Sequence, residues 1–151
     1  MSKSKRVLVS SAVGVVALGA IAAGGYAMAS TTTELTVENS SVLYTAPTSR
    51  SAGKLSYSAD VSDDSGVRSL KDVAWPKSSK LDPTAAELRH VDGATCRSTS
   101  DETVHCTYAP TVSKRDADES ADGTWYVSVL ATAKDGDTEF VARAATFEVT
   151  R

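Results

Sequence analysis

The chain has 151 residues, with 16 Lys and Arg against 19 Asp and Glu, and 41% of its residues are hydrophobic. This length predicts one ordinary domain. The acidic balance argues against nucleic acid or an anionic membrane surface as a partner, because phosphate binding needs clustered Lys and Arg.

The first 29 residues have the pattern of a cleaved export signal. Three basic residues precede an apolar run over residues 7–23, which is diluted only by Ser and Gly. Ala27-Met28-Ala29 then supplies small residues where a signal peptidase reads, which predicts cleavage before Ser30. The alternative is an uncleaved anchor, since about 20 apolar residues span a bilayer. The Ala- and Gly-rich composition and the A-x-A site favour the cleaved signal.

We therefore expect a signal peptide at residues 1–29 and a secreted, extracellular domain at residues 30–151, with no membrane association after cleavage. The signal holds three of the 16 basic residues and no acidic residue, so the remaining 122 residues carry a net charge of −6. Negative charge of this size keeps an exported protein soluble.

Two cysteines, Cys96 and Cys106, remain in a chain bound for an oxidising space. An even count there predicts one disulfide. The closed loop of about ten residues corresponds to about 2.5–3 kcal/mol in the chain-entropy estimate. A tetrahedral zinc site would need two more ligands, and His105 projects to the strand face opposite Cys106. The pair is therefore predicted to be structural.

Period-two alternation of apolar and polar residues predicts most of the chain to be strands. The clearest are residues 54–61 and 123–134, and the second ends at an Asp-Gly-Asp turn. Shorter strands are predicted at residues 34–38 and 42–45 with a break between them, and at 67–75, 94–97, 103–108 and up to Val149, with a bulge at 143–145 in the last.

One short helix is predicted over Thr84 to His90, with Asp82 as the N-cap and Pro83 at the first position. Residues 114–122 are predicted to be a charged surface connection. About seven strands, frequent turns and little helix indicate an all-β sandwich. A parallel sheet would need crossover helices that the sequence does not predict.

Three stretches, Asp60–Val67, Gly123–Val127 and Ala133–Asp137, resemble strand pairs and turns of bacterial immunoglobulin-like domains of secreted and surface proteins. The mature chain, including the cysteine hairpin and Trp75-Pro76, also resembles a family of small exported actinobacterial proteins of uncharacterised function. This resemblance covers most of residues 34–150. It implies an immunoglobulin-like antiparallel sandwich but no activity. The two cysteines depart from antibody-type domains, because they lie in neighbouring segments.

In an immunoglobulin-like topology, the turns after the second and sixth strands emerge at the same end. This would bring Asp60, Asp63 and Asp64 near Asp135 and Asp137. Such a group could bind Ca²⁺, which takes six to eight oxygen ligands. The alternative is that these residues only form turns, where Asp and Gly are common. Calcium is the one cofactor that the sequence suggests.

Catalysis has little support in the sequence. The two histidines, His90 and His105, lie in different segments with no supporting group or motif around them. Trp75 and Trp125 could line a binding groove, but their strand positions favour the core.

We therefore expect a secreted, non-catalytic immunoglobulin-like binding or interaction module whose partner is an unknown protein or cell-surface ligand. The first alternative is a calcium-binding extracellular domain that uses the loops at residues 60–64 and 135–137. The second is a secreted enzyme or enzyme inhibitor, in which a loop such as 114–122 acts.

Overall fold

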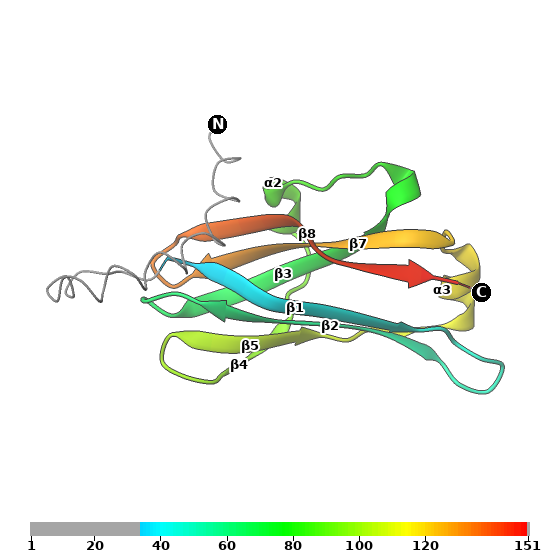
Figure 1. The fold of residues 1–151 in the computed structure, drawn as a ribbon, viewed down its shortest axis with the longest axis horizontal. Coiled ribbons are helices and arrows are strands. Elements are labelled where there is room, and N and C mark those ends of the chain that lie inside the picture. The colour runs from blue at the N-terminus through cyan, green and yellow to red at the C-terminus, as the bar shows by residue number, and fades with distance from the viewer. Residues whose placement is uncertain (1–33, 151) are drawn as a thin grey trace, which may run out of the picture.

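The structure is a computed structural model that describes residues 34–150, so the predicted signal peptide lies outside the described residues. Two antiparallel sheets stack face to face (Figure 1). The all-β sandwich is confirmed, with eight strands in the described range where about seven were predicted. None of the described helices has the length and apolar character to cross a membrane.

The first sheet has the order β1-β2-β5-β4, and a short β6 also pairs with β2. Its strands are β1 (Thr36–Thr45), β2 (Gly53–Ser62), β4 (Thr95–Ser98), β5 (Thr103–Tyr108) and β6 (Thr111–Val112). The second sheet has the order β3-β7-β8. Its strands are β3 (Val67–Pro76), β7 (Gly123–Ala133) and β8 (Thr138–Val149).

The core lies between the two sheets and is built from alternate residues of their strands, as the period of two predicts. On the first sheet these are mainly from β2, and on the second mainly from β7. The buried set is Leu35, Leu55, Tyr57, Ala59, Val61, Leu70, Cys106, Val127, Val129, Ala131, Ala133, Phe147 and Val149.

The sandwich is closed along one side and less tightly packed along the other. β1 packs against β8 and closes one side. On the other side, β3 is the edge of one sheet and the four-residue β4 is the edge of the other. The segment at residues 77–94 crosses from β3 to β4, and its helix α2 (Ala85–Leu88) lies on the outer side of the β3-β7-β8 sheet (Figure 1).

The predicted short helix exists, but its start was placed wrongly. Thr84, not Asp82, is the N-cap of α2, and it forms a capping box with Glu87. Asp82 instead adopts a left-handed conformation with φ 48°. A short 3₁₀ helix, η3 (Lys77–Ser79), precedes it.

Residues 114–122 were predicted to be a connection, and this was wrong for the first six. They form α3 (Lys114–Glu119), whose N-cap Ser113 makes a capping box with Asp116. The helix also buries Ala117. A capping signal and one packed residue therefore outweigh the neutral helix propensity of a charged run.

Both predicted irregularities in the outer strands are present. The break in β1 is a register shift between Glu38 and Ser41, with Asn39 at φ 54°. In β8, Val127 faces Ala145 whereas Val129 faces Val141, so residues 142–144 bulge opposite Ser128.

The predicted disulfide joins Cys96 and Cys106, which face each other directly across β4 and β5 with Cα atoms 4.0 Å apart. Cys106 is fully buried in the core. No free cysteine is present among the described residues. The bond therefore fixes the short edge strand β4 to its neighbour.

Replacing both cysteines with alanine should lower the free energy of unfolding by at least about 2.5–3 kcal/mol, because the unfolded chain regains the entropy of a loop of about ten residues. Loss of the buried Cys106 sulfur adds to this. Urea denaturation under oxidising conditions measures this. Ser98→Ala, at an exposed position of β4, is the control and should change stability by less than about 0.5 kcal/mol. A loss as small as in the control would mean that strand pairing alone holds β4.

Candidate functional site

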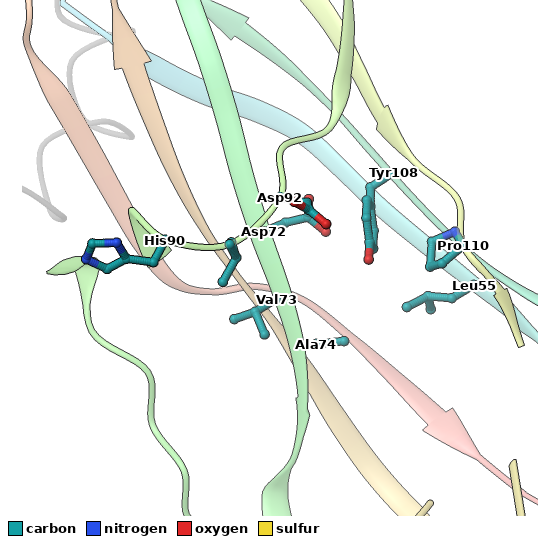
Figure 2. Close-up of a pocket in the computed structure, with 9 residues that line it drawn as sticks. Leu55, Asp72, Val73, Ala74, His90, Asp92, Tyr108 and Pro110 are labelled. Carbon is teal, nitrogen blue, oxygen red and sulfur yellow. The ribbon is translucent and has the colours of Figure 1, made fainter. Parts of the chain in front are cut away.

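The less tightly packed side of the sandwich contains a pocket of about 440 Å³ (Figure 2), here called the seam pocket. Its residues come from four parts of the chain. They are Leu55 of β2, Asp72, Val73 and Ala74 of β3, His90, Val91 and Asp92 of the crossover segment, and Tyr108 and Pro110 at the end of β5.

The rim of the seam pocket is held in place by hydrogen bonds to the strands. The Ala94 N–H donates to the Leu70 carbonyl at 2.8 Å. The Lys71 Nζ donates to the Val91 carbonyl, also at 2.8 Å. On the other wall, the Leu55 N–H donates to the Pro110 carbonyl at 3.1 Å. Both walls are therefore bonded to strands, one to β3 and the other to β2.

Asp72 is the unusual residue of this pocket. It faces Val129 across β3 and β7, and its neighbours of the same parity, Leu70 and Ala74, point toward the sandwich interior. Asp72 is only 5% exposed, and no donor in the described residues reaches its Oδ1 atom. Burial of an unpaired carboxylate disfavours its charged form. It raises the pKa of Asp72 to about 7.

Two further polar groups share this part of the pocket. Figure 2 shows Asp72, Asp92 and Tyr108 directed toward one region, whereas His90 points away from it. Burial raises the pKa of Tyr108, and the negative charges of Asp72 and Asp92 raise it further. The carboxyl groups of Asp72 and Asp92 are therefore both close enough to Tyr108 to disfavour ionisation of its phenol.

Asp72 was not among the site residues predicted from the sequence. A signal was present, because alternation along residues 70–74 places Asp72 on the same strand face as Leu70 and Ala74. A charged residue at a core-facing position is an exception to binary patterning and marks a position to examine.

The two acidic turns do meet at one end of the sandwich, as predicted. The Lys134 N–H donates to the Gly66 carbonyl at 2.9 Å, and the Asp135 N–H donates to the Ser65 Oγ at 3.2 Å. Carboxylate oxygens of Asp63, Asp64 and Asp135 lie within 4.8 Å of one another. Three of the five predicted ligands are therefore close together, and calcium binding there stays a prediction.

Turn formation already occupies part of this acidic group. The buried Asp63 accepts bonds at its Oδ2 from the Ser65 N–H at 2.9 Å and the Ser65 hydroxyl at 2.6 Å. The Asp137 N–H donates to the Asp135 Oδ1 at 3.0 Å, and the Asp137 carboxylate is not one of the three clustered groups. These are the local bonds for which Asp is common in turns.

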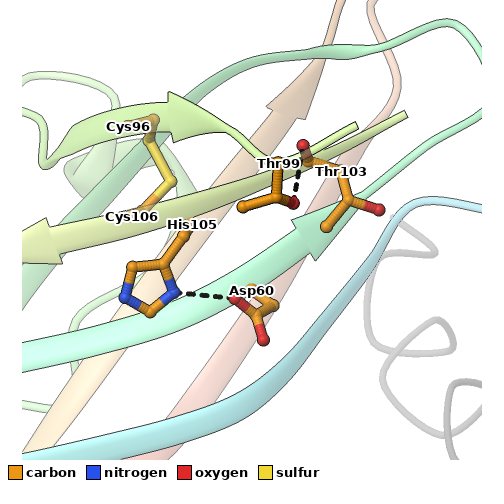
Figure 3. The surroundings of a disulfide bond; sticks show 6 residues. All are labelled: Asp60, Cys96, Thr99, Thr103, His105 and Cys106. Carbon is orange, nitrogen blue, oxygen red and sulfur yellow. Dashed lines mark hydrogen bonds and ion pairs between the residues drawn. A yellow bond between two sulfur atoms is a disulfide. The ribbon is translucent and has the colours of Figure 1, made fainter. Parts of the chain in front are cut away.

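Asp60, which was predicted to be a ligand, lies outside this group of three carboxylates. It lies on β2 opposite His105 of β5, and the His105 Nδ1 is 2.7 Å from its Oδ1 (Figure 3). The Asn39 Nδ2 also donates to its Oδ2 at 2.9 Å. The hydrogen bonds from His105 and then Asn39 lower the pKa of Asp60. Cross-strand register fixes this pair.

The expectation that neither histidine has a supporting group is wrong for His105. The side chains of His105 and Asp60 are 48% and 33% exposed, and neither residue lines the seam pocket. Acid–base catalysis by a histidine needs an oriented ring and a reacting group within reach. Within residues 34–150, His105 has no hydroxyl or thiol partner that would form a nucleophilic pair.

Both tryptophans are packed, as predicted. Trp75 is 3% exposed and lies on the outer face of its sheet, with its Nε1 donating to the Ser128 Oγ at 2.8 Å. Trp125 is half-buried and packs against Phe147 of the core. Trp75 and Tyr126 also border a second pocket of about 440 Å³, in which the Arg143 guanidinium lies 4.6 Å from the Tyr126 ring centre.

If the acidic turns bind calcium, the purified protein should melt several degrees higher in calcium than in excess chelator. An ion at about a hundred times its dissociation constant adds about 2.7 kcal/mol to stability. Asp64→Asn should abolish the shift, because Asp64 is an exposed member of the group. Asp60→Asn is the matched control and should keep it. An equal melting temperature with calcium and chelator would leave these loops as turns only.

Asp72→Asn should stabilise the protein at alkaline pH. An unfolded aspartate has a pKa of about 3.9, and burial raises the pKa of Asp72 to about 7 in the folded chain. Below about pH 3 the proton is bound in both states. As pH rises from about 4 to 7 only the unfolded chain releases it, so stability falls, by at most about 4 kcal/mol. The neutral Asn avoids this loss.

Urea denaturation at pH 4 and pH 8 tests this. We expect Asp72→Asn to gain about 1–4 kcal/mol over the wild type at pH 8 and far less at pH 4. The exposed Asp92→Asn is the control and should show no such pH-dependent gain. A variant that is no more stable than the wild type at pH 8 would contradict an unpaired buried carboxylate.

Comparison with known proteins adds one match. A model of a family of unknown function, DUF5707, matches residues 37–131. No curated protein and no solved structure gives a significant match. Because the matched residues run from β1 into β7 and cover more than half of the chain, the protein belongs to the DUF5707 family of unknown function.

Proposed function

We propose that this protein is a secreted, non-catalytic, immunoglobulin-like binding domain that holds its ligand in the seam pocket. One observation carries the proposal. The pocket has a volume in the range of small-molecule sites, a lining that combines apolar and polar residues, and a small group of converging polar side chains that includes the buried Asp72. Its partner is a cell-surface ligand or protein, and neither nucleic acid nor membrane is required.

The strand order supports the immunoglobulin-like part of the proposal. Constant-type immunoglobulin domains have strands A-B-E-D in one sheet and C-F-G in the other. With β6 set aside, the orders β1-β2-β5-β4 and β3-β7-β8 follow the same pattern in sequence. The disulfide departs from it, because it joins neighbouring strands of one sheet. A place among small exported actinobacterial proteins also belongs to the proposal.

The export signal pattern and the paired cysteines support secretion. Disulfides persist in oxidising compartments, and both cysteines of the chain are joined in one. The apolar run and the A-x-A site at residues 1–29 would serve as the export signal. Secretion would place the seam pocket in contact with extracellular or envelope molecules.

Two alternatives retain a specific observation each. A calcium-binding domain is supported by the grouping of Asp63, Asp64 and Asp135. A secreted enzyme or inhibitor is supported by the His105–Asp60 pair. The binding domain is favoured over the enzyme because the pair is exposed and lies apart from the seam pocket, so histidine and pocket do not form one site.

The test is binding of fluorescently labelled protein to intact cells of the organism that makes it. We expect saturable binding by the wild type and at least about tenfold weaker binding by Ala74→Phe, whose larger side chain fills the pocket. Ala86→Phe places the same ring at an exposed position of α2 and is the matched control. Circular dichroism melts establish that both variants are folded.

Two outcomes would contradict the proposal. Absence of saturable binding by the wild type would argue against a cell-surface ligand. Equal binding by a folded Ala74→Phe and the wild type would move the binding site away from the seam pocket.

A further inference from the structure

We infer that the seam pocket accepts a small organic ligand with a primary ammonium group, which pairs with the Asp72 carboxylate. This inference rests on the proposed function and deepens it by naming the ligand class. It is carried by the unmet hydrogen-bonding capacity of Asp72 and by the charges and shape around it.

The Oδ1 atom of Asp72 is a hydrogen-bond acceptor that no donor of the described residues uses. Asp72 is more than nine-tenths buried, with 5% of its surface exposed. Buried carboxylates in folded proteins are normally paired or hydrogen-bonded. An incoming N–H donor with a positive charge would supply both of the missing interactions at once.

The charged side chains that line the seam pocket favour a cation as the ligand. Asp72 and Asp92 both line the pocket, and none of its nine lining residues is Lys or Arg. The nearest basic residue in sequence, Lys71, lies on the opposite strand face and donates its Nζ to the Val91 carbonyl. The pocket therefore presents negative charge without an internal cation, which favours a cationic ligand and disfavours an anionic one.

The acceptors and the apolar surface of the pocket also match an ammonium group on a short hydrocarbon stem. An ammonium group has three N–H donors, and the directed groups of the pocket are the Asp72 and Asp92 carboxylates and the Tyr108 hydroxyl. Leu55, Ala74 and Pro110 supply apolar surface beside them for a short hydrocarbon stem.

The experiment uses three probes of equal chain length, namely n-butylammonium, butan-1-ol and butyrate. Each is titrated into ¹⁵N-labelled protein and followed by NMR chemical shifts. We expect butylammonium to shift the amides of residues 72–74, 91, 92 and 108, and to bind about 10- to 100-fold tighter than butan-1-ol at pH 8. Asp72→Asn should remove this preference, and Asp60→Asn, outside the pocket, should keep it.

The pH dependence provides a second readout. Burial raises the pKa of Asp72 to about 7, so its ionised fraction, and with it the affinity for butylammonium, should rise about tenfold from pH 6 to pH 8. The titratable groups facing Asp72 are Tyr57, Tyr108 and Asp92, and burial raises the pKa of both tyrosines, so they stay neutral in this range. His90 is the remaining ionisable residue that lines the pocket. His90→Gln is therefore the control, and it should show the same rise in affinity.

The outcomes separate this inference from the proposed function. Equal affinities for butylammonium and butan-1-ol, with shifts in the pocket, would overturn the ammonium ligand but leave the pocket as a binding site. Preference for butyrate, or no pocket shifts with any probe, would also overturn it. Affinity unchanged in Asp72→Asn would remove Asp72 from the site. The binding of Ala74→Phe to cells decides the proposed function independently.

Discussion

Burial of both faces of β7 is the constraint on which the two layers depend. Its inward residues, from Val127 to Ala133, fill the core between the sheets. Its outward residues Ser128 and Leu130 are buried on the other face, where the crossover segment passes. The Ser128 hydroxyl accepts the Trp75 indole N–H and donates to the Ala142 carbonyl at the bulge of β8. One side chain thereby joins all three strands of this sheet.

The position of the seam pocket follows from that arrangement. The crossover segment must cover the outer face of β7 and then return along the edge of β3 to begin β4. Its return is fixed by the Ala94 bond to Leu70, and this places Asp92 at the edge of the sandwich. Because β4 pairs only with residues 104–107 of β5, Tyr108 has no β4 neighbour. The pocket opens where the edge of the first sheet ends early.

The sequence predicted the features that local rules determine. Period two identified the strands, the cysteine count predicted the disulfide, and the parity break at residues 143–145 predicted the bulge of β8. It failed where partners come from elsewhere in the chain. The Asp60–His105 pair depends on the register of β2 against β5, which alternation alone does not specify. For α3, the Ser113–Asp116 capping signal was present, but its charged composition masked it.

Two buried aspartates show why acidity alone does not identify a site. Asp63 and Asp72 are both almost fully buried, at 1% and 5% exposure. Asp63 accepts two bonds from Ser65 and closes a turn, so its burial is explained by the fold itself. The Oδ1 of Asp72 has no donor within the described chain, and its burial costs stability at neutral pH. A sandwich needs polar groups in its turns, but it does not need an unpaired carboxylate on an inward strand face. The fold leaves the Oδ1 atom of Asp72 without a hydrogen-bond donor, and a ligand can supply one. Asp72 is therefore the residue at which to look for the function of this protein.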